Sequence, residues 1–172
     1  LFPYTTLFRS IVARDFMTDR PNKLWFTDIT YVWTWEGWLY VAFVLDLFFR
    51  GVVGLSMSNR ITDDLTQSAL QQALWRRRPP AGLIHHSDRG SQYASGDYQD
   101  LLKQNEIVPS MSRKGDCWDN AVAESFLHTL KVELVHRYRF KKRTEAQQAI
   151  FEYVEAFYNR KRTHSSLGYL SP

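Results

Sequence analysis

Three acidic residues occupy positions where acids are unusual. Asp28 interrupts the apolar run WFTDITYVW, Asp88 directly follows the short run LIHHS, and Glu124 lies in the segment AVAESFL. A carboxylate inside or at the end of a buried strand is costly unless a positive charge compensates it. Carboxylate oxygens are the ligands that Mg²⁺ and Mn²⁺ prefer, and such ions assist phosphoryl transfer. The three acids are therefore candidate ligands of a catalytic metal site.

Each acid taken singly also has an ordinary structural explanation. Asp28 could lie on the surface of an edge strand, Asp88 could be a helix N-cap, and Glu124 could be a solvated helix position. Taken together, the acids would come from two neighbouring strands and one helix, which is the minimum that a two-ion site needs. The combined pattern, with 35 residues between Asp88 and Glu124, favours the metal site.

The elements that would position these acids can be read from the hydrophobic pattern. It predicts five strands, at residues 24–33, 38–48, 52–58, 83–87 and 107–110. It also predicts helices near residues 65–74, near 98–102, from 119 or 120 to about 136, and from 144 to about 158. Thr62 or Asp63 is expected to cap the first helix and Thr144 the last one. Residues 89–92 are read as a turn and residues 111–118 as a mobile loop.

The order of these elements predicts the fold class. Three strands joined by tight turns form an antiparallel meander, and helix, strand, helix, strand and helix follow it. This is an α/β order and that of the ribonuclease-H-like fold: a five-stranded mixed sheet, three strands antiparallel and then two parallel, flanked by helices. We divide the chain into a non-native segment at 1–10, which resembles translated sequencing adapter, a linker at 11–23, a catalytic core at 24–160 and a basic tail at 161–172.

Composition limits the class of protein. The chain has 172 residues, of which 44% are hydrophobic and 23% charged, as in one globular domain. The net charge is +4, and basic residues cluster at 76–78, 137–143 and 160–162. Such clusters suit a polyanionic partner, although each could equally be a solvated helix end. One cysteine permits no internal disulfide, and no apolar run is long enough to span a membrane, so we expect a cytoplasmic protein.

Four sequence blocks carry a resemblance to a known family. They are TDITY around Asp28, HHSDRGSQY around Asp88, GDCWDNAVAESFLHTLK around Glu124, and the terminal YNRKRTHSSLGYLSP. With these blocks in this order, residues 12–172 resemble the bacterial insertion-sequence transposases encoded by the second reading frame of the insertion sequence three family. These proteins have a retroviral-integrase-like catalytic core.

The resemblance implies a DDE transposase in which Asp28, Asp88 and Glu124 are the catalytic metal ligands. It implies two Mg²⁺ or Mn²⁺ ions in the DNA-bound state. Water would cut one strand at each element end, and the freed 3′-hydroxyl would then attack another phosphodiester, with no covalent protein–DNA intermediate. The alternatives are a nuclease of the same fold that only hydrolyses, and an inactive, truncated DNA-binding remnant.

Residues near Glu124 are candidate DNA contacts. His128 and Lys131 follow Glu124 by four and seven residues, so all three share one helix face. Similar transposases and integrases use a basic residue at the position of Lys131, whereas an ordinary solvent face is the alternative. Asn120 lies one turn before Glu124 and either supports it or caps the helix, and we favour capping.

The remaining candidates lie after the second acid and near the C-terminus. Arg89 and Gln92 belong to the expected turn that could approach DNA. Arg160 and Arg162 belong to the terminal block, which either binds DNA or closes the domain against its sheet. Of the two histidines before Asp88, we expect one inside the strand and one exposed near the site; they do not predict zinc, because no further ligands stand at suitable spacing.

The resemblance also implies partners. These are the element ends and target DNA, a second copy of the chain in the active complex, and possibly the product of the first reading frame; no membrane is involved. Family members carry an N-terminal helix-turn-helix region that recognises the terminal repeats. Since the similarity begins only near residue 12, we expect this polypeptide to fold and bind metal yet fail to transpose.

Overall fold

The computed structural model describes residues 18–112 and 121–172, and its centre is one mixed sheet. The strands are β1 (Leu24–Thr34), β2 (Gly37–Asp46), β3 (Val52–Ser58), β4 (Ile84–Ser87) and β5 (Val108–Met111). Their order in the sheet is β3-β2-β1-β4-β5. β1 pairs antiparallel with β2 and β2 with β3, whereas β4 pairs parallel with both β1 and β5. This confirms the predicted five-stranded mixed sheet.

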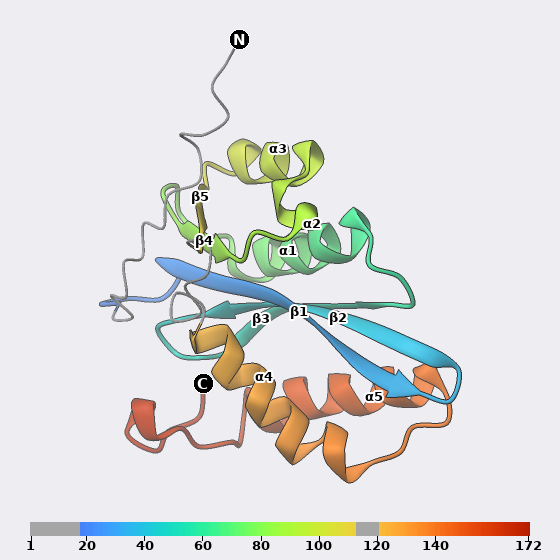
Figure 1. The fold of residues 1–172 in the computed structure, drawn as a ribbon. Coiled ribbons are helices and arrows are strands. Elements are labelled where there is room, and N and C mark those ends of the chain that lie inside the picture. Colours follow the sequence, from blue (N-terminus) through green and yellow to red (C-terminus); the bar gives the residue numbers. More distant parts are fainter. Residues whose placement is uncertain (1–17, 113–120) are drawn as a thin grey trace.

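Helices cover both faces of the sheet (Figure 1). One face carries α1 (Asp63–Arg77), α2 (Ser91–Ala94) and α3 (Gly96–Gln104). The other carries α4 (Ala121–Glu133) and α5 (Arg143–Glu152), and α5 continues as a π-helical turn over Tyr153–Tyr158. Two short 3₁₀ segments lie at Val135–Arg137 and Ser165–Leu167.

The strands alternate their side chains between two separate cores, which is why the sheet needs helices on both faces. Phe26 of β1 belongs to the core under α4 and α5, where the rings of Phe43 and Phe126 lie 4.6 Å apart. The preceding residue, Trp25, belongs to the core under α1 and α3. Successive residues of β1 therefore face opposite helical layers.

β3 and α1 approach each other unusually closely. A Cβ atom added to Gly54 would overlap with the backbone carbonyl oxygen of Ala69 and would lie 3.0 Å from the Cβ of Ala73. The obstacle is helix backbone, which cannot move aside as a side chain can. Glycine at position 54 thus permits the contact between strand and helix.

Two boundaries differ from the prediction. The N-cap of α5 is Lys142 rather than Thr144, because the Glu145 carboxylate accepts hydrogen bonds from the backbone N–H groups of Lys141 (3.0 Å) and Lys142 (3.3 Å). Residues 91 and 92 belong to the short helix α2 rather than to a turn, because the Gly90 carbonyl accepts from two N–H groups further along the chain. Within the described ranges, none of the helices could cross a membrane.

Candidate active site

Strand register brings Asp28 and Asp88 together. The parallel pairing of β1 with β4 aligns Phe26 with His86. Continuing this register by two residues places Asp28 level with Asp88, which directly follows β4. Because paired strands lie about 4.8 Å apart, the two acids are neighbours on the central strands of the sheet. Two of the three predicted acids are thus adjacent.

Both acids lie on the sheet face that α4 covers. Phe26 belongs to the core on that face, and its ring centroid is 5.3 Å from that of His86. Asp28 and Asp88 each follow one of these residues by two positions, so the alternation of side chains returns them to the same face. The Asp28 carboxylate accepts a hydrogen bond from the Ile29 N–H (2.7 Å), and that of Asp88 accepts one from the Gly90 N–H (2.9 Å).

Two buried hydroxyl groups, of Thr27 and Tyr93, lie near the acids on the opposite face of the sheet. The Thr27 hydroxyl donates to the Phe43 carbonyl (2.7 Å) and lies 3.3 Å from the Tyr93 hydroxyl. Burial is the main cause that raises the pKa of Tyr93, and the charges of Asp28 and Asp88 raise it further. Tyr93 therefore stays neutral beneath the two carboxylates. Sequence analysis missed this residue; its place in the block that follows Asp88 was the available signal.

Both histidines of β4 are buried, so the expectation that one is exposed is wrong. His86 Nδ1 lies 2.9 Å from the Ser110 hydroxyl and His86 Nε2 lies 3.1 Å from that of Ser112. His85 faces the other layer, where its Nε2 lies 3.1 Å from the Tyr98 hydroxyl. Both imidazole rings are thus engaged in contacts with hydroxyl groups inside the fold.

Glu124 lies in the first turn of α4 and is exposed. Further along α4, Lys131 Nζ is 5.7 Å from the centroid of the Tyr31 ring on β1. Counting back from this contact, seven helix residues span about 10.5 Å and three strand residues about 10 Å. α4 and β1 run in the same general direction (Figure 1), and Glu124 precedes Lys131 on α4 as Asp28 precedes Tyr31 on β1.

The third acid does not, however, complete a metal-binding cluster. Over residues 18–112 and 121–172, no group of three or more histidine, cysteine, aspartate or glutamate side chains is arranged to hold a metal ion. Asp28 and Asp88 are adjacent through strand pairing, whereas Glu124 is carried by a helix on the same face of the sheet.

The candidate DNA contacts on α4 are accessible. His128 is exposed and Lys131 is half-buried beside Tyr31. Asn120, whose role as a cap was predicted, lies outside the described residues, as does most of the loop expected at 111–118. The two basic side chains and Glu124 belong to the same helix, as their spacing predicted.

The other basic candidates differ in their surroundings. Arg89 is exposed, and its Nε donates to the Ser112 carbonyl (2.8 Å), so it lies close to Asp88. Gln92 is half-buried in α2, and Arg160 is exposed. Arg162 is held by both carboxylate oxygens of Glu133 at 2.7–3.0 Å. This ion pair ties Arg162 to Glu133, the last residue of α4, whereas Glu124 lies in the first turn of that helix.

Comparison with protein families gives a consistent result. Residues 18–117 match a family described as "Integrase core domain", and residues 105–172 match a second family with the same description. The chain is 51% identical over 163 residues to "Transposase InsF for insertion sequence IS3A" of Escherichia coli (strain K12), covering 95% of this chain and 57% of the relative. It is equally similar to "Insertion element IS600 uncharacterized 31 kDa protein" of Shigella sonnei, of which it covers 60%.

Solved structures share the fold. The HTLV-2 integrase catalytic core domain in complex with magnesium (trimeric form) superimposes with a TM-score of 0.70 at 19% identity, over 90% of this chain and 96% of that one. The simian T-cell lymphotropic virus intasome gives a TM-score of 0.74 at 18% identity, over 99% of this chain and 58% of that one. These likenesses bear out the ribonuclease-H-like fold. The chain spans less than two thirds of the curated relatives' length.

Proposed function

Because this chain belongs to the integrase core domain family, we propose that it is the catalytic domain of a DNA transposase. Its activity would be divalent-metal-dependent cleavage of a DNA strand, followed by strand transfer from the freed 3′-hydroxyl. The observation that carries the proposal is the alignment of Asp28 with Asp88 on adjacent parallel strands, under the helix that bears Glu124.

The side chains fit a hard divalent cation. Two carboxylates side by side repel each other unless a positive charge lies between them, and an all-oxygen donor set suits Mg²⁺ or Mn²⁺. Asp28 and Asp88 would hold the metal, and Glu124 would complete its ligands when DNA is bound. Bound divalent ions would polarise the scissile phosphate and lower the pKa of the attacking oxygen.

The chain itself would mainly position the reactants. The amides of Ile29 and Gly90 fix the orientation of the two aspartates. Attack of a water oxygen on phosphorus would break the P–O3′ bond and leave a 3′-hydroxyl. That hydroxyl would then attack the phosphorus of a target phosphodiester, break its P–O3′ bond and release the target's 3′-hydroxyl, which joins the strands. Lys131 and Arg89 would contact backbone phosphates and keep the reacting groups in line.

The working complex would contain more than one copy of the chain. Two DNA ends have to be joined to one target, which a dimer or higher oligomer achieves by holding one end in each copy. The HTLV-2 integrase core is known in dimeric and trimeric forms. The product of the first reading frame is a further candidate partner, and bacterial DNA in the cytoplasm is the expected setting.

A strand-transfer assay tests the proposal. A labelled duplex that ends in a free 3′-hydroxyl is incubated with the chain, Mn²⁺ and a target plasmid, and joined products are measured. Joining supports the transposase, whereas cleavage without joining supports a nuclease of the same fold. Asp28→Asn and Asp88→Asn should each reduce the cleaved and the joined products by at least about a hundredfold. Asp64→Asn, in the first turn of α1, is the matched control and should retain activity.

Metal binding gives a second readout that needs no DNA. Mn²⁺ should raise the unfolding temperature of the wild type, because an ion that binds only the folded state stabilises it. Asp88→Asn should remove this effect, whereas Glu124→Gln should remove only part of it in the absence of DNA. A full Mn²⁺ response in the Asp88→Asn variant would contradict the assignment of that ligand.

A further inference from the structure

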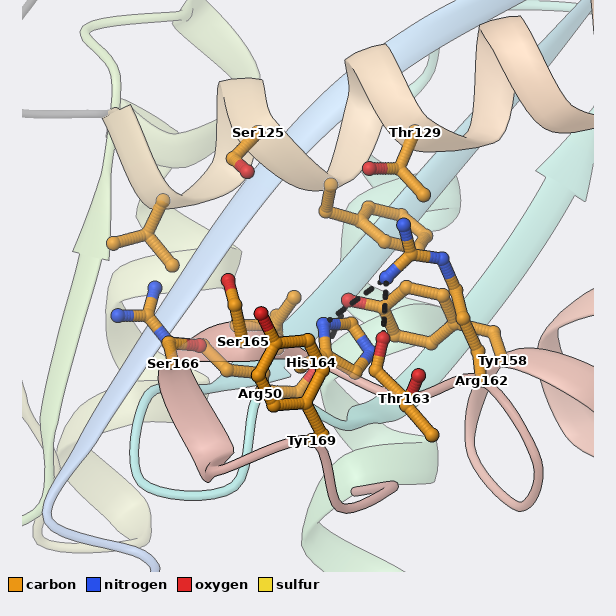
Figure 2. A pocket seen from close by; sticks show the side chains of 13 residues that line it. Arg50, Ser125, Thr129, Tyr158, Arg162, Thr163, His164, Ser165, Ser166 and Tyr169 are labelled. Atoms are coloured by element: carbon orange, nitrogen blue, oxygen red, sulfur yellow. Dashed lines mark hydrogen bonds between the residues drawn. The ribbon is translucent and has the colours of Figure 1, made fainter.

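A polar cavity lies between α4 and the C-terminal segment, which we define as residues 159–172. Its volume is about 500 Å³, large enough for a nucleotide-sized group. Figure 2 shows Ser125 and Thr129 projecting from α4 on one side and Ser165 and Ser166 on the other. The lining residues are Leu45, Arg50, Val122, Ser125, Phe126, Thr129, Tyr158, Arg162, Thr163, His164, Ser165, Ser166 and Tyr169.

The chemistry of this lining suits an anion. It contains two arginines and several hydroxyl groups, and no carboxylate occurs among the described residues that line it. Arg162 is neutralised by Glu133, which lies outside the lining. Arg50 has no such partner: none of the ion pairs found in residues 18–112 and 121–172 involves its guanidinium. Burial lowers the pKa of Arg50, as expected for a cation that has lost water without gaining an anion.

His164 supplies a second, independent observation. Arg162 Nη1 lies 3.3 Å from His164 Nδ1, and because arginine can only donate, Nδ1 accepts this hydrogen bond. Burial and the charges of Arg162 and Arg50 lower the pKa of His164, so the neutral ring carries its proton on Nε2. This buried Nε2 has no hydrogen-bond partner in the described part of the chain. His164 therefore lines the cavity and carries an N–H that has no acceptor, although this atom is itself closed to solvent.

The cavity is held open by contacts around the start of β3. The Asn159 side chain accepts from the Val52 N–H and donates to the Val52 carbonyl, both at 2.9 Å. The Tyr158 hydroxyl donates to the Arg50 carbonyl (3.1 Å). These bonds fix the backbone on both sides of the cavity before any ligand arrives. Arg50 is thus presented by a constrained loop, with φ of 60°, and not by a flexible arm.

The cavity and the acid pair lie on opposite flanks of α4. At 100° per residue, Ser125 and Thr129 project to one side of the helix, toward Leu45 of β2. Lys131 projects to the other side, toward Tyr31 of β1. A ligand in the cavity would therefore lie across α4 from Asp28 and Asp88, at the β2 and β3 side of the sheet.

We propose that this cavity is a second phosphate-binding site, in which Arg50 and the surrounding hydroxyl groups bind a backbone phosphate of DNA away from the carboxylates. Arg160 and Lys161, which directly precede Arg162 in the chain, are exposed and add positive charge to the C-terminal segment. The proposal rests on the proposed function only in taking DNA as the source of the phosphate. A site of this kind would hold the duplex on one flank of α4 while the reaction proceeds on the other.

The test measures binding of a fluorescent, non-specific duplex to the full chain in EDTA, where no strand is cut. Arg50→Gln should weaken binding and reduce the slope of log affinity against log salt by about 0.9, the value for one phosphate contact. The ratio of the wild-type affinity to the variant's affinity should therefore fall about 3.5-fold when the salt concentration rises from about 50 to about 200 mM. Arg60→Gln removes an equal charge from an exposed position outside the cavity and should leave the slope unchanged.

A second pair of variants keeps the test valid if Arg50→Gln fails to fold. Ser166→Glu adds a negative charge at an exposed position of the lining and should weaken DNA binding, whereas Ser68→Glu on an exposed position of α1 should not. Arg50→Lys should restore most of the salt slope. Equal salt slopes for wild type and Arg50→Gln, together with unchanged binding by Ser166→Glu, would overturn the proposal.

A titration distinguishes DNA from free phosphate. The NMR signal of the Arg50 side chain is followed during addition of inorganic phosphate and, separately, of the duplex. Movement with the duplex supports the proposal, and movement with inorganic phosphate alone overturns the assignment to DNA. These readouts need neither metal nor catalysis, so a failure of strand transfer leaves them interpretable.

Discussion

Acidification should destabilise the fold through His85. This side chain is buried, with 1% of its surface exposed, and its Nε2 lies 3.1 Å from the Tyr98 hydroxyl. Burial, with a smaller contribution from His86, lowers the pKa of His85 to about 3. In the unfolded chain the same ring titrates near its ordinary pKa of about 6.5. Below that pH the ring is therefore protonated in the unfolded state but neutral in the folded state.

The size of the effect follows from the two pKa values. The contribution of His85 to the free energy of unfolding is unaffected well above pH 6.5, falls as pH drops below that value, and levels off only near pH 3. The limiting slope is about 1.4 kcal/mol per pH unit, which gives a loss of about 2 kcal/mol at about pH 5. Such a loss is a large fraction of the stability of an ordinary domain.

Urea unfolding at about pH 7 and pH 5 measures this loss. His85→Gln keeps an acceptor for the Tyr98 hydroxyl but cannot titrate, so its loss between the two pH values should be smaller than that of the wild type by about 2 kcal/mol. His136→Gln removes an exposed histidine and should behave like the wild type. If the free energy of unfolding falls equally between the two pH values in wild type and His85→Gln, His85 is not the cause of the acid sensitivity. This holds whatever the stability of the variant at neutral pH.

Two further predictions concern stability. Gly54→Ala should destabilise the fold by about 2–3 kcal/mol, because the added methyl group meets the backbone of Ala69, whereas Gly96→Ala has open space and should change stability by less than about 0.5 kcal/mol in urea unfolding. A double-mutant cycle of Glu133→Gln and Arg162→Gln should give a coupling of about 1 kcal/mol, since the pair is bidentate but about a quarter exposed. A coupling near zero would mean that the C-terminal segment is held by its other contacts.

The sheet could be predicted because its signals are local. β1 to β3 are dense in apolar and aromatic residues and are joined by short turns. The local preference of these segments for strand therefore agrees with the structure that tertiary contacts impose. Asp28 and Asp88 were identifiable for the same reason, since each interrupts or ends an apolar run. Their adjacency follows once β1 and β4 are assigned to neighbouring positions in the sheet.

Features that depend on packing were not predictable. The burial of His85 and His86 depends on α3 on one face and on Ser110 of β5 and Ser112 after it on the other, which no local pattern reveals. Thr144 was a reasonable cap by residue type, but the Glu145 carboxylate reaches back and starts α5 earlier. The surroundings of Arg50 could not be predicted from the sequence, because its cavity is built by helix α4 and by a segment more than a hundred residues later.

The pairing of β1 with β4 has a consequence for insertions and deletions. The two acids meet through register, so changes of length in the connections at residues 59–62 or 78–82 leave their alignment intact. A single residue inserted between Leu24 and Asp28 would instead reverse the face on which Asp28 emerges and turn it toward the layer of α1. Length variation among functional homologues should therefore accumulate in those connections and be absent from the first five residues of β1.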